Sequence, residues 1–124
     1  MGMYHERIVK GSPAVIIIVG DNMLRRILMR YCLRLDFQII SLINPTVFDL
    51  KALLRSQNIQ YTLSDSSFSP KIMELRESEH DALKCIYLVK RPQKMITRLQ
   101  NNDSILEIPF TLNDLKKTLF TSQN

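Results

Sequence analysis

Two aspartates of this chain, Asp21 and Asp65, lie at positions where a carboxylate could do chemistry. Asp21 follows an apolar run in the stretch VIIIVGDNMLRR (residues 15–26), and Asp65 follows another in LSDSSFS (residues 63–69). If the two runs are neighbouring parallel strands, both carboxylates meet in one crevice and suit a hard cation such as Mg²⁺. The alternative is that Asp21 caps a helix and Asp65 forms a turn. Residue types alone favour this alternative.

Strand and helix signals alternate along the chain and would position these residues. Residues 14–19 are continuously apolar and β-branched, as a strand covered by helices on both faces requires. Apolar residues at helical spacing follow, with arginines on the opposite side. Proline and capping signals begin further helices. The predicted strands are 14–19, 37–42, 59–64, 83–89 and 104–108, and the predicted helices begin near Asp21, Pro45, Pro70, Pro92 and Thr111.

This alternation predicts the architecture. Short connections between strand and helix imply right-handed crossovers and a parallel sheet between two helical layers. In such sheets, functional residues gather beyond the carboxyl ends of the strands. Asp21 and Asp65 are the acids that the pattern places there.

The composition is that of one ordinary globular domain. The 124 residues are 45% hydrophobic and 23% charged, enough for a core without disulfides or metals. The net charge of +5 favours acidic partners through long-range attraction. We find neither an apolar run of about 20 residues nor a signal-peptide pattern, and therefore expect a cytoplasmic protein without membrane association. Cys32 and Cys85 lie in apolar segments and are predicted to be reduced core residues.

Three stretches, in matching order, carry a resemblance to a known family. VGDN resembles an acidic pair followed by asparagine, LSDSSFS a phosphoacceptor loop, and EIPFTLNDL a lysine-proline-phenylalanine turn before the last helix. Over residues 14–120 the chain resembles the response-regulator receiver (CheY-like) domains of two-component signalling. The resemblance implies a flavodoxin-like (βα)5 α/β fold, a doubly wound parallel sheet of five strands in the order 2-1-3-4-5. Residues 1–13 and 121–124 would be tails, and the Ile108–Pro109 bond would be cis.

The resemblance also implies a site, from which this chain departs. Asp65 would be the phosphoacceptor, and Mg²⁺ would be held by Asp21, Asp65 and the backbone carbonyl of Ser67. Gly20, however, stands where the family has the first acid of its pair. Ile108 stands where a lysine would pair with the phosphoryl group. One ligand and one cation are therefore missing.

Two further positions depart from the family pattern. The hydroxyl residue that ends the fourth strand aligns with Val89 or Lys90, and neither carries a hydroxyl. Lys90 would be either a partial substitute for the lost lysine or an exposed residue at the end of a strand. The switch aromatic of the fifth strand aligns with Ile105, which has no ring.

These departures predict an atypical receiver, or pseudo-receiver, that acts in signal transduction by protein–protein interaction. Phosphorylation at Asp65 would be impaired or absent, because phosphoryl transfer depends on charge stabilisation. We expect no enzyme activity, no required cofactor and at most weak Mg²⁺ binding. The alternative is a Mg²⁺-dependent, phosphorylatable receiver that controls a DNA-binding output domain outside this chain.

Two surfaces are candidates for the partner, which would be a sensor kinase, a phosphotransfer or output domain, or a second copy of the chain. The first helix offers Arg25, Arg26 and Met29 beside the crevice. For the second surface, which the resemblance places around the fourth helix, fifth strand and fifth helix, a solvated basic face is the alternative. Its residues are Lys94, Arg98, Ile105, Glu107, Lys116 and Lys117.

Other function classes lack their motifs. With three glycines and no glycine-rich fingerprint, the chain is not expected to bind flavin or dinucleotide. We find no helix-turn-helix pattern and no zinc ligand set, and we expect no nucleic-acid partner for this domain alone.

Overall fold

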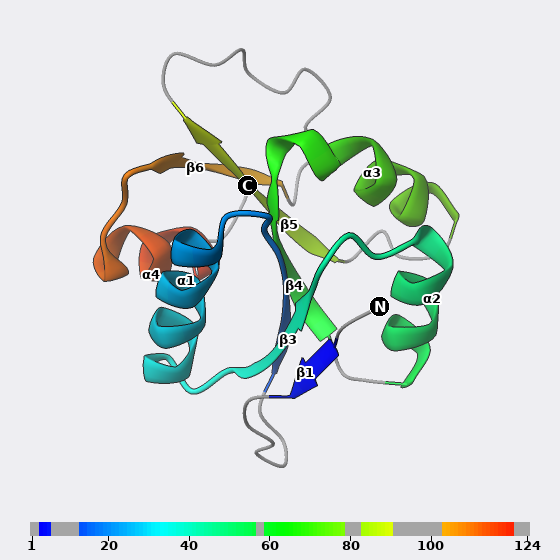
Figure 1. Ribbon diagram of the computed structural model, residues 1–124, viewed down its shortest axis with the longest axis horizontal. Coiled ribbons are helices and arrows are strands. Elements are labelled where there is room, and N and C mark those ends of the chain that lie inside the picture. Colours follow the sequence, from blue (N-terminus) through cyan, green and yellow to red (C-terminus); the bar gives the residue numbers. More distant parts are fainter. Residues whose placement is uncertain (1–2, 6–12, 57–58, 79–82, 91–102, 121–124) are drawn as a thin grey trace.

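The chain folds into a sheet with helices on both of its faces (Figure 1). A computed structural model describes residues 3–5, 13–56, 59–78, 83–90 and 103–120. The elements are β1 (Met3–His5), β2 (Ala14–Ile18), α1 (Asn22–Arg34), β3 (Gln38–Leu42), α2 (Val47–Ser56), β4 (Ile59–Asp65), the 3-10 turn η1 (Ser66–Phe68), α3 (Ser69–Ser78), β5 (Lys84–Lys90), β6 (Ser104–Ile108) and α4 (Leu112–Phe120).

The sheet has the predicted parallel order. Its strands lie in the order β1-β3-β2-β4-β5-β6, and the pairs β3–β2, β2–β4, β4–β5 and β5–β6 are all parallel. Without β1, this is the order 2-1-3-4-5 of a flavodoxin-like fold. The central strands β2 and β4 are direct neighbours, so Asp21, which follows β2, and Asp65, the last residue of β4, lie at one edge of the sheet.

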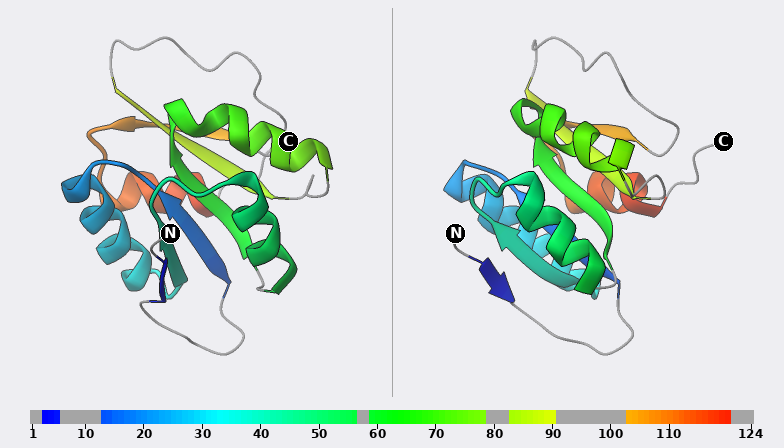
Figure 2. Two further views of the ribbon diagram at one scale, coloured as in Figure 1. Left: turned by 45° about the vertical axis from the view of Figure 1, so that its right-hand side comes forward. Right: turned by 90° about the vertical axis from the view of Figure 1, so that its right-hand side faces the viewer.

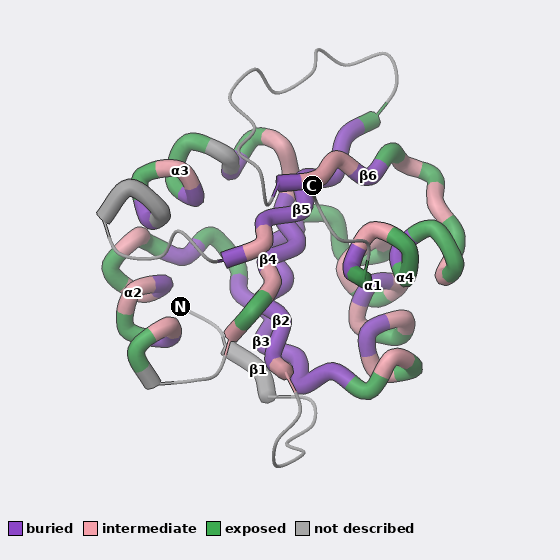
Figure 3. The backbone as a smooth tube through the Cα atoms, turned by 180° about the vertical axis from the view of Figure 1, so that it is seen from behind, coloured by how far each residue is buried: buried purple, intermediate pink, exposed green. Residues whose placement is uncertain are grey.

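Alternation along β2 explains its uninterrupted apolar run. Val15 and Ile17 pack with α1 and α4 on one face, whereas Ile16 and Ile18 pack with α2 and α3 on the other. Both faces are covered, so successive side chains that point in opposite directions are all buried. Figure 2 shows α2 and α3 together on their face, and Figure 3 shows buried residues following the strands through the molecule.

Helix α1 has the predicted phase. Leu28 and Cys32 are fully buried in the core, and Arg30 is exposed. Both cysteines are buried and free, as predicted. The helix ends where Asp36 adopts a left-handed backbone with φ of 64°, a conformation that aspartate tolerates better than most residues.

Helices α2 and α4 share one capping arrangement. Thr111 and Asp114 exchange hydrogen bonds between side chain and backbone at 2.9 and 3.1 Å, which confirms Thr111 as the predicted cap. Thr46 and Asp49 do the same at 3.0 Å, so α2 begins later than the predicted Asn44–Pro45 start. These bonds hold the pKa of Asp49 below its usual value.

One strand of the sheet was not expected from the sequence. Residues 3–5, which the sequence analysis placed in a tail, form β1, an edge strand antiparallel to β3. The helix expected to begin at Pro92 lies outside the described residues. The Ile108–Pro109 bond is cis, as expected. No helix in the described part of the chain is both long and apolar enough to cross a bilayer.

Candidate functional site

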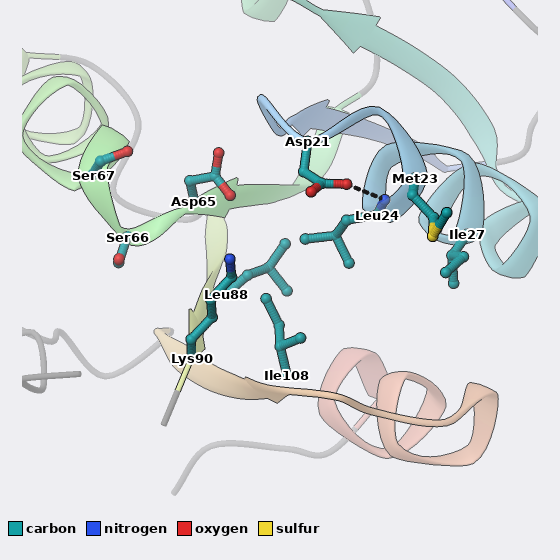
Figure 4. A pocket seen from close by; sticks show the side chains of 10 residues that line it. All are labelled: Asp21, Met23, Leu24, Ile27, Asp65, Ser66, Ser67, Leu88, Lys90 and Ile108. Atoms are coloured by element: carbon teal, nitrogen blue, oxygen red, sulfur yellow. Dashed lines mark hydrogen bonds between the residues drawn. The ribbon is translucent and has the colours of Figure 1, made fainter. Parts of the chain in front are cut away.

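A cavity of about 580 Å³ opens at the carboxyl edge of the sheet, and we refer to it as the crevice (Figure 4). It lies between the first turns of α1 and the ends of β4, β5 and β6. The structure brings the two aspartates together, as the strand pattern predicted, and it places Lys90 and Ile108, which the resemblance assigned to the site, in the same cavity. The lining residues are Asp21, Met23, Leu24, Ile27, Asp65, Ser66, Ser67, Leu88, Lys90 and Ile108.

Asp21 caps α1 and lines the crevice at the same time. Its Oδ1 accepts a hydrogen bond from the Leu24 backbone N–H at 2.8 Å, as the dashed line in Figure 4 marks. This bond satisfies one of the free N–H groups at the start of the helix. A carboxylate has two oxygens, so capping occupies only part of its capacity to accept. The cap and the crevice are therefore compatible roles for Asp21.

Asp65 is the last residue of β4 and is half-buried. Its Oδ2 accepts a hydrogen bond from the Gly20 backbone N–H at 2.9 Å. This bond joins the loop after β2 to the end of β4 and fixes the carboxylate at the mouth of the crevice. Ser66 and Ser67, in η1, follow directly and line the same cavity.

Gly20 is exposed, and the local backbone does not require a glycine. It does not adopt the left-handed conformation that favours glycine. A Cβ at this position would lie 3.7 Å from Asp65 Oδ2, which is ordinary van der Waals contact. An acidic side chain would therefore fit at position 20.

Of the two residues that aligned with the end of the fourth strand, Lys90 lines the crevice and Val89 is buried. In Figure 4 the Lys90 side chain extends from the end of β5 toward Asp65. Its neighbour across the β5–β6 pair is Ile108, a half-buried side chain that packs against the core and also lines the crevice. The cation in this crevice thus comes from β5 and not from β6.

The donor set is small for a metal. Among the described residues, no group of three or more His, Cys, Asp and Glu side chains could hold a metal ion. The two aspartates of the crevice each accept a backbone N–H through one oxygen. A Mg²⁺ ion prefers several oxygen ligands in near-octahedral geometry. Water would have to supply most of the ligands of a Mg²⁺ ion bound between these two carboxylates.

The candidate residues on α1 have different environments. Arg25 donates to the Val19 carbonyl at 2.8 Å and to the side chain of Asn22, so it holds the loop after β2 in place. Met29 is half-buried and packs against the core, whereas Arg26 is exposed. Arg26 is therefore the exposed side chain of these three.

The second candidate surface is described in part. Glu107, Lys116 and Lys117 are exposed on β6 and α4, and Ile105 is half-buried. Helix α4 contacts β6, so the two elements that carry these residues are adjacent. Lys94 and Arg98 lie outside the described residues.

Three large apolar side chains that the sequence pattern did not single out are exposed near the carboxyl edge. Met23 at the start of α1 is 73% exposed, Ile43 after β3 is 53% exposed, and Phe48 in the first turn of α2 is 79% exposed. Helical periodicity gives a usable signal for Phe48, which lies off the inward stripe that Leu50 and Leu53 mark.

Comparison with solved structures defines the class of fold, that of response-regulator receiver domains. A receiver protein from Pseudomonas putida matches with a TM-score of 0.62 and 17% identity, over 90% of this chain and 98% of that chain. A receiver domain protein from Bacillus halodurans C-125 matches with a TM-score of 0.62 and 14% identity, over 87% and 95% of the two chains.

The chemotaxis protein CheY4 from Vibrio cholerae matches with a TM-score of 0.59 and 14% identity, over 87% of this chain and 97% of that chain. No family model matches the sequence, and no curated protein matches it either. The chain therefore has the receiver fold, and at these identities the likeness concerns the fold.

Proposed function

We propose that this chain is an atypical receiver domain that regulates a signalling process by binding a protein partner, with phosphorylation at Asp65 impaired or absent. The observation that carries this proposal is the lining of the crevice. Asp65 is present there, but the position on β6 where the resembled family has a lysine holds Ile108. The partner would be a sensor kinase, a phosphotransfer domain or an output domain, and the location would be cytoplasmic.

The chemistry of phosphoryl transfer supports this proposal. The transferred group carries charge on its equatorial oxygens, and catalysis rests on positioning and on stabilising that charge. With Gly20 in place of an acid, the crevice has one carboxylate fewer to hold a divalent cation. An apolar side chain at 108 provides no charge for the phosphoryl oxygens. The chain would thus need no cofactor, would bind Mg²⁺ weakly and would not act as an enzyme.

Lys90 favours the second candidate function, a Mg²⁺-dependent receiver that is phosphorylated at Asp65 and controls an output domain outside this chain. Its side chain lines the same cavity as Asp65. An ammonium at this position would supply part of the charge that Ile108 does not. The two functions differ in whether Asp65 acts as a switch.

Labelling with a small phosphodonor in the presence of Mg²⁺ tests the proposal. We expect intact-mass measurements to find the protein largely unmodified, and its amide spectrum to be unchanged by beryllofluoride and Mg²⁺. A receiver that has the full set of acids and the lysine serves as the positive control. Rapid, Mg²⁺-dependent labelling that is lost in Asp65→Asn and that changes dimerisation or partner affinity would establish the second function instead.

A further inference from the structure

The crevice continues beyond Asp65 into a second, smaller cavity of about 180 Å³. Asp65 and Ser67 line both cavities, so the two cavities adjoin at the end of β4. Gly20, which has no side chain, lies in the wall of the smaller cavity. The remaining residues of this wall come from the ends of β2 and β3 and from η1, and they are Ile18, Val19, Ile43, Asn44 and Phe68.

Exposed apolar side chains flank the two cavities. Met23 lines the larger cavity and Ile43 the smaller one, at 73% and 53% exposure. Phe48, at 79% exposure, follows in the first turn of α2, beyond the loop that contains Ile43. Single exposed apolar residues are common, but a group of them beside a concave site marks a surface for interaction. The edge of the sheet therefore has apolar flanks with a carboxylate between them.

The charges that line the crevice specify the polar part of a partner. Among the described residues that line it, Asp21 and Asp65 contribute two carboxylates and Lys90 one ammonium, a balance of one negative charge. The chain as a whole has a net charge of +5, so this negative charge is local. A polybasic segment would be repelled by the rest of the surface, whereas a single basic side chain would be attracted at short range.

We propose that the two cavities form a docking groove for a segment of a partner protein that carries one arginine or lysine between apolar side chains. The basic group would pair with Asp65 and with the carboxylate oxygen of Asp21 that does not cap α1. Arginine can bind a carboxylate through two parallel hydrogen bonds. One apolar side chain would enter the larger cavity beside Leu24 and Ile27, and another would cover Ile43. This inference rests on the proposed function, because it names the surface through which the domain would bind its partner.

Peptide titration of the full chain tests the groove. The probe is a synthetic helical peptide with one central arginine and with leucines three and four residues to either side. We expect saturable shifts of backbone amide resonances at Gly20, Met23, Ile43 and Ser66, measured without Mg²⁺ or phosphodonor. A matched peptide with glutamate in place of the arginine should not saturate. Shifts that map instead to Lys116 and Lys117 on α4, or no saturable shifts, would overturn the proposal.

Variants of the chain distinguish specific peptide binding in the groove from non-specific binding to exposed apolar side chains. Met23→Ser and Ile43→Ser should each weaken binding about tenfold, as expected for large apolar side chains that the peptide buries. Phe120→Ser is the matched control, because Phe120 is 54% exposed on α4, away from the groove. Its effect should be less than about twofold, the range of a peripheral contact. Equal effects of all three substitutions would contradict the proposal.

The peptide titration and the labelling of Asp65 are separate measurements, so the docking groove and the proposed function can fail separately. If the peptide saturates the groove and Asp65 is labelled rapidly, the docking groove stands and the proposed function fails. If no peptide binds at the groove and Asp65 resists labelling, the docking groove fails and the proposed function stands. Concentration-dependent self-association that Met23→Ser abolishes would assign the groove to a second copy of this chain, against our proposal.

Discussion

Replacing Gly20 by aspartate should create a Mg²⁺-dependent stability that the natural chain lacks. The substitution fits sterically, because a Cβ would lie 3.7 Å from Asp65 Oδ2 and the backbone is not left-handed there. It would place a third carboxylate beside Asp21 and Asp65. Without a cation, the added carboxylate would be repelled by Asp65 in the folded state, where the two lie close together, and much less in the unfolded chain, so the free energy of unfolding should fall.

The size of this fall follows from Coulomb's law. Two carboxylates about 5 Å apart repel by about 1 to 3 kcal/mol for effective dielectric constants between about 80 and 20. Gly20 is exposed, so solvent and salt keep the repulsion near the lower figure. For a domain of this size, about 1 kcal/mol corresponds to a change in melting temperature of about 3 to 6 °C. Mg²⁺ should restore this loss, because it neutralises the cluster.

Thermal unfolding in the presence of a chelator, and then of millimolar Mg²⁺, measures this effect. Gly20→Asn is the matched control, since it has the same shape without the charge and should respond little to Mg²⁺. The double variant Gly20→Asp/Asp65→Asn should lose most of the stabilisation by Mg²⁺. The difference measures how far residues 20 and 65 act together in binding the ion. Equal stabilisation by Mg²⁺ of the natural chain, Gly20→Asn and Gly20→Asp would refute the reasoning, since the natural crevice would then already hold the ion.

Two further predictions concern the core. Leu28→Ala should lower the free energy of unfolding by about 2–5 kcal/mol, because Leu28 is fully buried. Arg30→Ala, on the exposed side of the helix, should change it by less than about 0.5 kcal/mol. Denaturant melts that find equal losses for the two variants would contradict the assigned helix phase. Burial raises the pKa of the Cys32 thiol to about 12, so between about pH 8.5 and 12 the unfolded chain loses this proton while the folded chain keeps it, and stability falls. Denaturant melts up to pH 10.5 or so should therefore find a steeper loss for the natural chain than for Cys32→Ala, and parallel curves would mean that the thiol ionises equally in both states.

The sequence predicted the parts of the fold that depend on strong local patterns. The run 14–19 is apolar on both faces, a pattern that fits a central strand, and β2 occupies that place. The stripe through Leu28 and Cys32 fixed the phase of α1. The position of Asp21 and Asp65 at one edge then followed from the geometry of parallel strands.

Features that depend on tertiary contacts could not be predicted in this way. The three-residue strand β1 has no periodicity of its own, and it forms because β3 offers an unpaired edge. The start of α2 depended on whether Asn44 or Thr46 would cap it, and both residue types are good caps. Arg25 was placed on a partner surface because the first helix lies beside the crevice, and no local pattern indicates that its guanidinium binds the Val19 carbonyl across the loop.

The crevice combines residues that the fold needs with residues that it does not. Asp21 is held in place by its capping bond to the Leu24 N–H, and Asp65 by its bond to the Gly20 N–H, so both contribute to local structure without any ligand. At position 20 only the backbone N–H contributes to this local structure. At position 108 an apolar side chain packs against the core, where a lysine would contribute only the methylene groups of its side chain. On the proposed function, the chemistry would therefore be lost first at positions 20 and 108, where a change costs the fold least. The two aspartates would remain because they also stabilise the edge of the sheet, and their carboxylates would then be left for a basic group from a partner.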